Sequence, residues 1–242
     1  MSYAFMTDTG LARSKNQDAV YATDDRIGIL PNLYVVADGM GGHKAGEYAS
    51  TYALDQIKIV ASNANGSGPV QVLNQAITTA NAAVYGKATQ DADKVGMGTT
   101  VVAATIDGNQ LTVANVGDSR LYLCRDRRLE QITVDHSIVE EMVNNGQLSR
   151  NLAKDHPKRN FITRAVGAEP QVRVDFFEED LKANDLILLC SDGLTTMVDE
   201  NDIAEIITRD VALDKRVEEL VTRANANGGM DNITVILIDP YR

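Results

Sequence analysis

Four aspartates in this chain stand at the ends of strongly apolar runs, next to glycine or asparagine: Asp38, Asp118, Asp192 and Asp231. A carboxylate at the end of a buried strand is held rigidly, yet it reaches the rim of the sheet where a ligand can approach. A neighbouring glycine permits a tight turn and leaves a main-chain carbonyl able to bind a ligand as well. These positions therefore have the residue types and the setting of a cation site.

Carboxylate and carbonyl oxygens are the ligands that Mg²⁺ and Mn²⁺ prefer. The sequence has only three histidines and two cysteines, so a zinc site of His and Cys ligands is not expected. One Asp-Gly pair is also ordinary turn chemistry, and that interpretation stays open for each position alone. Four such positions in one small chain favour divalent metal binding.

The glycine-rich segment between Asp38 and His43 allows a loop that closes around a ligand. A helix expected to begin near residue 45 would point its N-terminus at this loop, which favours anions there. The segment lacks the Gly-x-Gly-x-x-Gly spacing, and no Gly-Lys-Ser/Thr follows it. Nucleotide binding, and with it an organic cofactor, is therefore not expected.

The elements that must position these residues can be read from the apolar pattern. Strands are predicted at 33–37, 99–106, 110–116, 120–125, 186–190 and 233–238, with a weaker pair at 4–7 and 18–22. Helices are predicted at 45–61 and 70–88, with shorter ones at 138–144, 200–209 and 213–225. Clustered strands with two long helices inserted early predict an α+β fold, and we expect residues 1–242 to form one domain.

The stretch at about 135–167 is polar and weakly periodic. A long connection of this kind is either a plain surface excursion or a functional flap. We name residues 135–167 the flap.

The composition is that of a soluble globular chain, with 44% apolar and 24% charged residues among 242. A net charge of −11 disfavours nucleic acid and anionic membranes as partners. Bound cations would reverse this field locally and admit a phosphorylated substrate. The sequence has no apolar run of membrane-spanning length, and its start lacks the features of a signal peptide, so we expect a cytoplasmic protein. Cys124 and Cys190 lie in apolar runs and are expected to be buried free thiols.

Seven segments together resemble the bacterial metal-dependent serine/threonine protein phosphatases, the type 2C or PPM family. They are RSKNQD (13–18), VADGMGGH (36–43), GTT (98–100), ANVGDSR (114–120), HPKRNFITRAVG (156–167), SDG (191–193) and GMDNIT (229–234). They occur in order and cover nearly the whole chain. The resemblance implies a four-layer α-β-β-α sandwich, with two central antiparallel sheets flanked by helices and a metal site in a cleft at one end.

The resemblance also implies roles for single residues. Asp38 would bridge two Mg²⁺ or Mn²⁺ ions, and the Gly39 carbonyl would bind one of them. Asp192 and Asp231 would complete the pair of sites, Asp18 would lie nearby, and Asp118 would share a third, weaker ion with Asp192. Arg13 would grip the substrate phosphate, and a water or hydroxide between the two ions would attack it.

Three positions depart from the pattern of animal members. The histidine that directly follows Asp-Gly there is replaced by Met40, and His43 lies three residues later. His43 is kept as a candidate general acid, with loop capping as its other interpretation. Gln17 stands where some relatives have Glu, so position 17 is not expected to bind a metal ion directly. Thr196 stands where some relatives have Asp, so the third ion would rest on Asp118, Asp192 and a group from the flap. His136 and His156 are expected to be structural.

The resemblance implies hydrolysis of phosphoserine and phosphothreonine in proteins, opposing a bacterial serine/threonine kinase in signalling, by a chain expected to be a monomer. One alternative is a pseudophosphatase that binds phosphoproteins without turnover, which the missing early histidine would allow. A metal-dependent nuclease fits the carboxylates but not the acidic surface.

Overall fold

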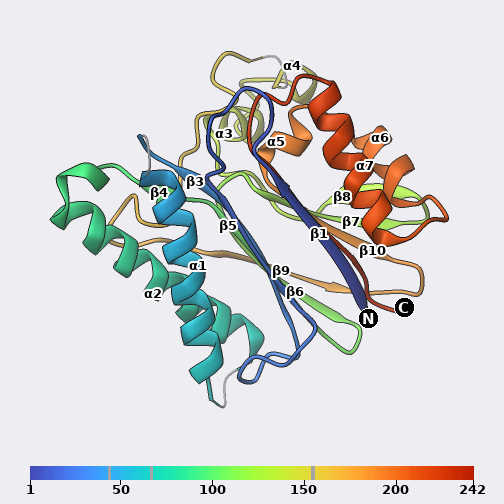
Figure 1. Ribbon diagram of the computed structural model, residues 1–242, viewed down its shortest axis with the longest axis horizontal. Helices are drawn as coiled ribbons and strands as arrows, with labels where there is room; N and C mark the ends of the chain where they lie inside the picture. The colour runs from blue at the N-terminus through green and yellow to red at the C-terminus, as the bar shows by residue number, and fades with distance from the viewer. Residues whose placement is uncertain (43–44, 66–67, 154–155) are drawn as a thin grey trace.

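The computed structural model describes residues 1–42, 45–65, 68–153 and 156–242, and its centre is a pair of stacked antiparallel sheets (Figure 1). One sheet has the order β1 (Ser2–Asp8), β11 (Ile233–Asp239), β10 (Leu186–Cys190), β7 (Arg120–Arg125) and β8 (Arg128–Gln131). The other has the order β2 (Asp18–Thr23), β3 (Leu33–Met40), β5 (Val101–Asp107), β6 (Gln110–Val116) and β9 (Asp175–Asp180), and β4 (Gly98–Thr99) pairs with β3.

Helices cover the outer face of each sheet. The long helices α1 (Ala45–Asn63) and α2 (Pro69–Gln90) pack against the β2–β9 sheet. On the other side, α6 (Glu200–Ile207) and α7 (Leu213–Ala226) pack against the β1–β8 sheet, next to the short α5 (Asp192–Thr195). This order of layers confirms the predicted α-β-β-α sandwich.

Alternating side chains of the central strands fill separate layers of the core. On β3, Val35 and Ala37 face the helices, whereas Tyr34 and Val36 face the other sheet. Because successive side chains of a strand point to opposite faces, a strand buried on both faces reads as a continuous apolar run. This is why the central strands were visible in the sequence.

The sequence prediction missed the elements that lack such a run. The edge strands β8 and β9 have the sequences RLEQ and DFFEED, and every residue in them is half-buried or exposed. Three short helices were missed as well: the 3₁₀ turn η1 (Ala92–Lys94), α4 (Arg150–Ala153) and α5. None of the three exceeds four residues, which is too short for a helical period to be recognised.

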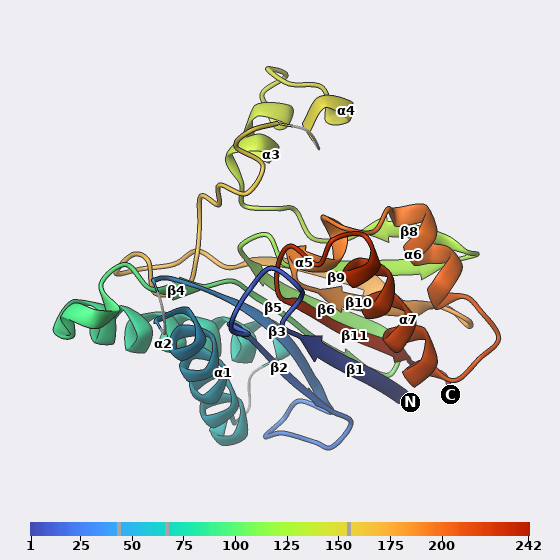
Figure 2. The same ribbon diagram turned by 45° about the horizontal axis from the view of Figure 1, so that its top comes forward.

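The flap stands away from the sheets and carries α3 (Ile138–Asn144) and α4, as Figure 2 shows. Ser137 begins α3 as its N-cap, because its hydroxyl accepts a hydrogen bond from the amide of Glu140 at 3.1 Å. In the described part of the chain, no helix has the length and apolarity needed to cross a membrane.

Strands β7 and β10 are tied together at the end of the sheet where Leu186 pairs with Cys124. Here the Asp185 side chain is 1% exposed, and it accepts hydrogen bonds from Arg125 Nε and Nη2 at 3.0 and 2.7 Å. The amide of Lys182 donates to the same carboxylate at 2.7 Å. Burial alone would raise the pKa of Asp185, but these donors hold it below its ordinary value.

Asp185→Asn is expected to lower the free energy of unfolding at pH 7 by about 2 kcal/mol, because the charge-assisted bonds are lost. When the pKa of a carboxylate is lower in the folded than in the unfolded state, the carboxylate stabilises the fold at pH values above its unfolded-state pKa. This stabilisation is lost as the pH falls through the folded-state pKa. The difference between variant and parent should therefore shrink below about pH 4. Urea unfolding at pH 7 and pH 3 checks this, and an equal difference at both would contradict an ionic role.

Candidate metal centre and active site

The five predicted aspartates meet at one end of the two sheets. Asp18 and Asp38 are directly opposite each other in the pairing of β2 with β3. Asp192 follows β10, and Asp231 precedes β11, the antiparallel neighbour of β10. Asp118 lies in the turn between β6 and β7. The structure thus brings together residues separated by more than 200 positions, whereas His43 lies outside the described residues.

Burial and mutual repulsion raise the carboxyl pKa values of Asp18, Asp38, Asp118 and Asp192. Burial, and then the charges of Asp18 and Asp192, raise the pKa of Asp38 well above its ordinary value. Burial and Asp192 raise the pKa of Asp118 to about 8, while burial, reinforced by Asp231, raises that of Asp192 to about 6. Negative charges concentrated in this way would be stabilised by a bound cation.

Two carboxylate oxygens in the cluster are buried without a hydrogen-bond partner: Asp18 Oδ1 and Asp192 Oδ1. The other oxygen of Asp18 accepts from the hydroxyls of Ser191 and Thr234 at 2.8 and 2.7 Å. These bonds oppose the larger effect of burial, which raises the pKa of Asp18 to about 7. Buried oxygens that no protein donor satisfies are the ligands that a hard divalent cation requires.

The carboxylates of the cluster do not converge on one metal position. Within the described ranges, no three His, Cys, Asp or Glu side chains are grouped so that they could hold one metal ion. Asp231 is turned toward Arg13, whose Nη2 lies 2.7 Å from Asp231 Oδ2. An ion at this position must complete its coordination with carbonyl and water oxygens, or draw Asp231 away from Arg13. With that provision, the oxygen-only set fits Mg²⁺ or Mn²⁺.

The backbone of Asp38 is held by Thr100, the residue between β4 and β5. The Asp38 amide donates to Thr100 Oγ1 at 2.9 Å, and the Thr100 amide donates to the Asp38 carbonyl at 2.8 Å. A Cβ at Gly39 would lie 2.1 Å from the Gly46 carbonyl oxygen of α1 and 2.6 Å from that of Gln17. Only glycine lets α1 pack this close to the end of β3.

A second glycine, Gly193, allows close contact between the loops that carry Asp192 and Asp231. A Cβ at Gly193 would lie 2.0 Å from the carbonyl oxygen of Asn232. The turn from β10 into α5 therefore rests directly on the backbone before β11, which fixes Asp192 relative to Asp231.

Asn232 was not singled out from the sequence, although it lies within the segment 229–234. It is 4% exposed, and its amide nitrogen donates to the carbonyls of Thr9 and Lys15 at 2.8 and 2.9 Å. Its amide oxygen accepts from the Gln17 amide at 2.8 Å. One side chain thus holds the loop that carries Arg13 at both ends.

Asn232→Ala is expected to lower the free energy of unfolding by about 2–3 kcal/mol, because buried main-chain groups lose their partner. It should also raise the KM for a phosphopeptide, since the loop holding Arg13 loses its anchor. Thermal unfolding and steady-state kinetics check both effects. Asn227→Ala is the control, because Asn227 is exposed and its side-chain amide donates to the Met197 carbonyl at 2.7 Å, away from the loop that carries Arg13. Equal effects of the two substitutions would contradict the anchoring role.

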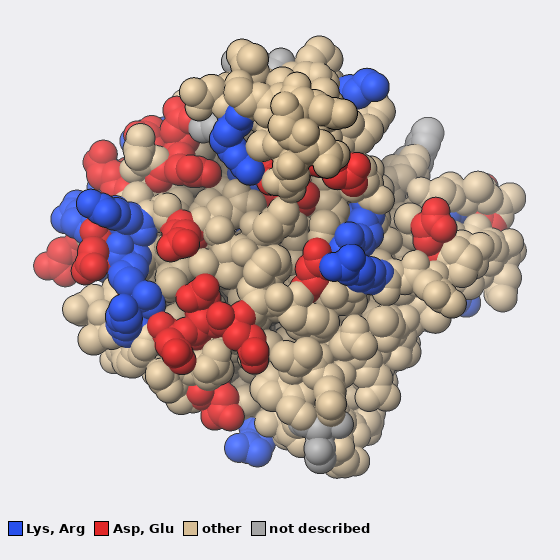
Figure 3. Space-filling model, turned by 180° about the vertical axis from the view of Figure 1, so that it is seen from behind, with Lys and Arg blue, Asp and Glu red and all other residues tan. Residues whose placement is uncertain are grey.

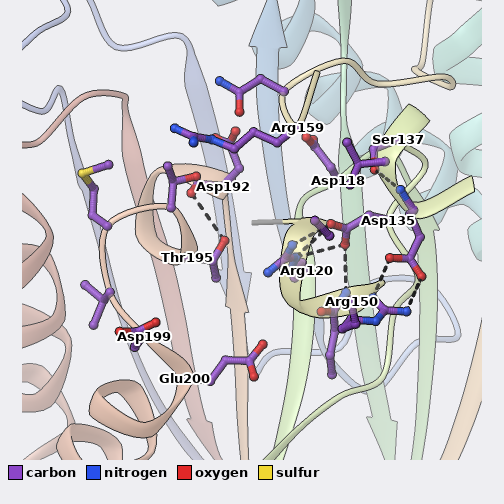
Figure 4. A pocket seen from close by; sticks show the side chains of 18 of the residues that line it. Asp118, Arg120, Asp135, Ser137, Arg150, Arg159, Asp192, Thr195, Asp199 and Glu200 are labelled. Atoms are coloured by element: carbon purple, nitrogen blue, oxygen red, sulfur yellow. Dashed lines mark hydrogen bonds and ion pairs between the residues drawn. The ribbon is translucent and has the colours of Figure 1, made fainter. Parts of the chain in front are cut away.

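A groove of about 590 Å³ begins at the cluster, where Asp118 and Asp192 line it. It continues between the flap and the segment from α5 to α6 (Figure 4). One side carries Asp192, Thr195 and Glu200, and the other carries Arg120, Asp135 and Arg150. Two of its arginines are ion-paired, Arg120 with Asp135 at 2.7 Å and Arg150 with Glu140 at 2.6 Å. The groove therefore leads from the flap to two of the five aspartates.

The surface reflects the net charge of −11. On the face drawn in Figure 3, acidic side chains gather in several patches, with groups of Lys and Arg between them.

Comparison with known proteins gives one consistent answer. A family model described as protein phosphatase 2C matches residues 5–142 and 137–233. The serine/threonine phosphatase stp of Listeria monocytogenes is 40% identical over 99% of this chain and 96% of its own length.

Solved structures agree with this. The serine/threonine phosphatase Stp1 from Staphylococcus aureus superposes with a TM-score of 0.91 at 38% identity, covering 98% of this chain and 94% of that one. The catalytic domain of the phosphatase PstP, in complex with two manganese ions, gives a TM-score of 0.85 at 34% identity, covering 98% and 96%.

Proposed function

The chain belongs to the protein phosphatase 2C family and is a serine/threonine protein phosphatase, and from this premise we propose that its aspartate cluster holds the divalent cations that hydrolysis requires. The observation that carries the proposal is the pair of buried, unpartnered oxygens on Asp18 and Asp192. Burial also raises the carboxyl pKa values of Asp18, Asp38, Asp118 and Asp192. The similar PstP structure contains two manganese ions, which supports the choice of metal.

In this proposal Asp38 contributes to both of two core sites, Asp192 and Asp231 complete them, and the Gly39 carbonyl is a further ligand. Asp18 lies at the edge of the pair, and Asp118 shares a third, weaker ion with Asp192. Two divalent cations held together lower the pKa of a water nucleophile and stabilise both the attacking and the leaving oxygen. Mg²⁺ and Mn²⁺ both match the oxygen-only ligand set.

Arg13 is the group that binds the substrate phosphate. Its side chain is 52% exposed at the rim of the cluster, and the hydrogen bond that it donates to Asp231 keeps the guanidinium oriented toward the site. A guanidinium presents two parallel N–H donors that match two phosphate oxygens. Arg13 thereby orients the phosphoryl group over the carboxylates and offsets part of their negative charge.

The groove below the flap receives the polypeptide on either side of the phosphorylated residue. It leads from Asp118 and Asp192 past α5, so a bound chain would place its phosphate at the cluster. We therefore extend the proposal to residues 135–167 as a functional flap of a single domain. His43 remains a predicted general acid.

We further propose that the protein acts in the cytoplasm as a monomer, opposing a serine/threonine kinase in bacterial signalling. Cys124 and Cys190 are buried and unpaired, as is usual in reducing compartments. The alternative of a phosphoprotein-binding pseudophosphatase receives no support, because the similar proteins are named phosphatases.

Hydrolysis of a phosphothreonine peptide by chelator-treated protein tests the metal requirement. Phosphate release should be abolished by the chelator and restored by added Mn²⁺ or Mg²⁺. Full activity in excess chelator would refute the proposed role of the cations. A phosphotyrosine peptide is the control for specificity, and it should be a much poorer substrate.

A further inference from the structure

We propose that His136 is a positioning residue that couples the flap to the loop carrying Asp118. The inference rests on the proposed function of the cluster, but it concerns a side chain that touches neither the groove nor the aspartates. It arises from hydrogen bonds that join both ends of the flap to the turn between β6 and β7.

The backbone of His136 lies where the chain enters the flap. Its amide donates to the Gly117 carbonyl at 3.0 Å, and its carbonyl accepts from the Thr163 amide at 2.8 Å, where the chain leaves the flap. The next residue, Ser137, forms a β-bridge with Ile162. The two connections of the flap are thus joined to each other, and this junction is joined to Gly117 (Figure 2 shows the flap beyond it).

The imidazole of His136 adds a second bond to the same glycine. The side chain is 6% exposed, and its Nδ1 accepts from the Gly117 amide at 2.9 Å. Its Nε2 lies 3.0 Å from Asp175 Oδ2 and 2.8 Å from Arg164 Nη1. Since a neutral imidazole carries one proton, these contacts determine where that proton must be.

Two assignments are conceivable, and burial decides between them. A proton on Nδ1 would leave the buried Gly117 amide without an acceptor, which is costly. A proton on Nε2 leaves Nδ1 free to accept from that amide and is itself donated to Asp175. Arg164 then cannot donate to Nε2, and its Nη1 donates to Asp175 Oδ1 at 3.0 Å instead. Burial lowers the pKa of His136, which favours the neutral ring. Asp175 therefore fixes the tautomer that holds Gly117.

Gly117 is held on its other side by Thr100, against which its backbone packs. Its φ is +108°, and a Cβ there would lie 2.6 Å from Thr100 Cβ. Two residues on, Ser119 shares a 2.7 Å hydrogen bond with the Thr100 hydroxyl, which also accepts from the Asp38 amide. Asp118 thus lies in a turn clamped between His136 and Thr100, and Thr100 also fixes Asp38.

The ion pair between Arg120 and Asp135 makes the test specific. Arg120 donates to both oxygens of Asp135, at distances of 2.7 to 3.1 Å. This bond keeps the flap attached when the imidazole is changed. Replacing His136 should therefore loosen the turn at Asp118 without detaching the flap or unfolding the sheets.

Substitutions to Asn and Gln distinguish the roles of the two ring nitrogens. In His136→Asn, the amide oxygen takes the place of Nδ1 and can still accept from Gly117. In His136→Gln, the amide reaches toward Asp175 but leaves Gly117 without its acceptor. We expect His136→Gln to raise the Mn²⁺ concentration for half-maximal activity at least tenfold and to lower kcat without a matching rise in KM. His136→Asn should stay within about threefold of the parent.

Hydrogen–deuterium exchange supplies a readout that does not require turnover. His136→Gln should exchange faster at residues 117–120 and at the flap, with helix α7 unchanged, and His136→Asn should resemble the parent. Val221→Ala is the control for general loss of stability, because Val221 is a buried residue of α7. It should lower the melting temperature without altering exchange at 117–120.

Unchanged exchange at 117–120 in His136→Gln would overturn the proposal. The proposal would also be overturned if the Gln and Asn variants lost the same activity and their losses followed the decrease in melting temperature. His136 would then have only a structural role. If the parent protein hydrolysed no phosphopeptide, the proposed function would fail, whereas the exchange measurement would still decide the positioning of the turn.

Discussion

Asp192→Asn is expected to lower kcat on a phosphothreonine peptide by at least about 10³-fold, equivalent to about 4 kcal/mol of transition-state stabilisation. The substitution preserves the shape of the side chain, but it replaces a charged ligand oxygen with an amide. The charge of Asp192 acts on both Asp38 and Asp118, so Asp192 would serve both the core ions and the third ion. Steady-state kinetics at saturating Mn²⁺ measure the effect.

The same substitution should leave the protein in chelator at least as stable as the parent. Burial, and then the charge of Asp231, raise the pKa of Asp192 to about 6, so ionising it at pH 7.5 costs free energy in the folded state. When the pKa of an acid is higher in the folded than in the unfolded state, this cost is fully present above the folded-state pKa. It decreases as the pH falls and is absent below the unfolded-state pKa of about 4. The amide removes the cost, which is on the order of 3 kcal/mol.

Thermal unfolding with chelator and with Mn²⁺ completes the test. The parent should gain stability on adding Mn²⁺, and Asp192→Asn should gain much less. Asp55→Asn on the exposed face of α1 is the control and should behave as the parent in both assays. Normal turnover in Asp192→Asn would remove this residue from the metal centre.

Arg13→Ala is expected to reduce kcat/KM for a phosphopeptide by about 10- to 100-fold, because a charge-assisted bidentate interaction contributes about 1.5–3 kcal/mol. Arg13→Lys should recover only part of this loss, since an ammonium keeps the charge but not the planar fork. Arg13→Ala also frees Asp231 from its 2.7 Å ion pair. A moderate increase in Mn²⁺ affinity is therefore expected beside the loss of activity.

Lys15→Ala is the matched control, because Lys15 is an exposed cation in the same loop. It should change kcat/KM by less than about threefold. If Arg13→Ala and Lys15→Ala had the same effect, the role of Arg13 would be general electrostatic attraction rather than phosphate binding.

The buried strands and the long helices could be predicted from the sequence because their apolar pattern is local. Leu186–Cys190 is apolar throughout, since Leu188 faces the helices and Leu189 the other sheet. The extension of β3 through Asp38 to Met40 could not be predicted in this way. It depends on pairing with Asp18 in β2 and with Thr99 in β4, which lie elsewhere in the chain.

The site could be predicted in part, for a similar reason. Asp38, Asp118, Asp192 and Asp231 stand beside glycine or asparagine at strand ends, and the structure gathers all four. The residues that support them leave no such signal: Asn232 anchors a loop 217 residues away, and Thr100 bonds the Asp38 amide. His136 was expected to be structural, and its bonds to Gly117 and Asp175 depend on the fold rather than on any motif.

Titration of chelator-treated protein with Mn²⁺ by isothermal calorimetry tests the central claim most directly, because it counts the ions. The parent protein should bind two ions with the higher affinity and a third more weakly, and Asp38→Asn should lose at least one of the two tight sites. Activity measured on the same samples should rise with occupancy of the tight sites. Absence of Mn²⁺ binding, or identical binding by the parent and Asp38→Asn, would contradict the account.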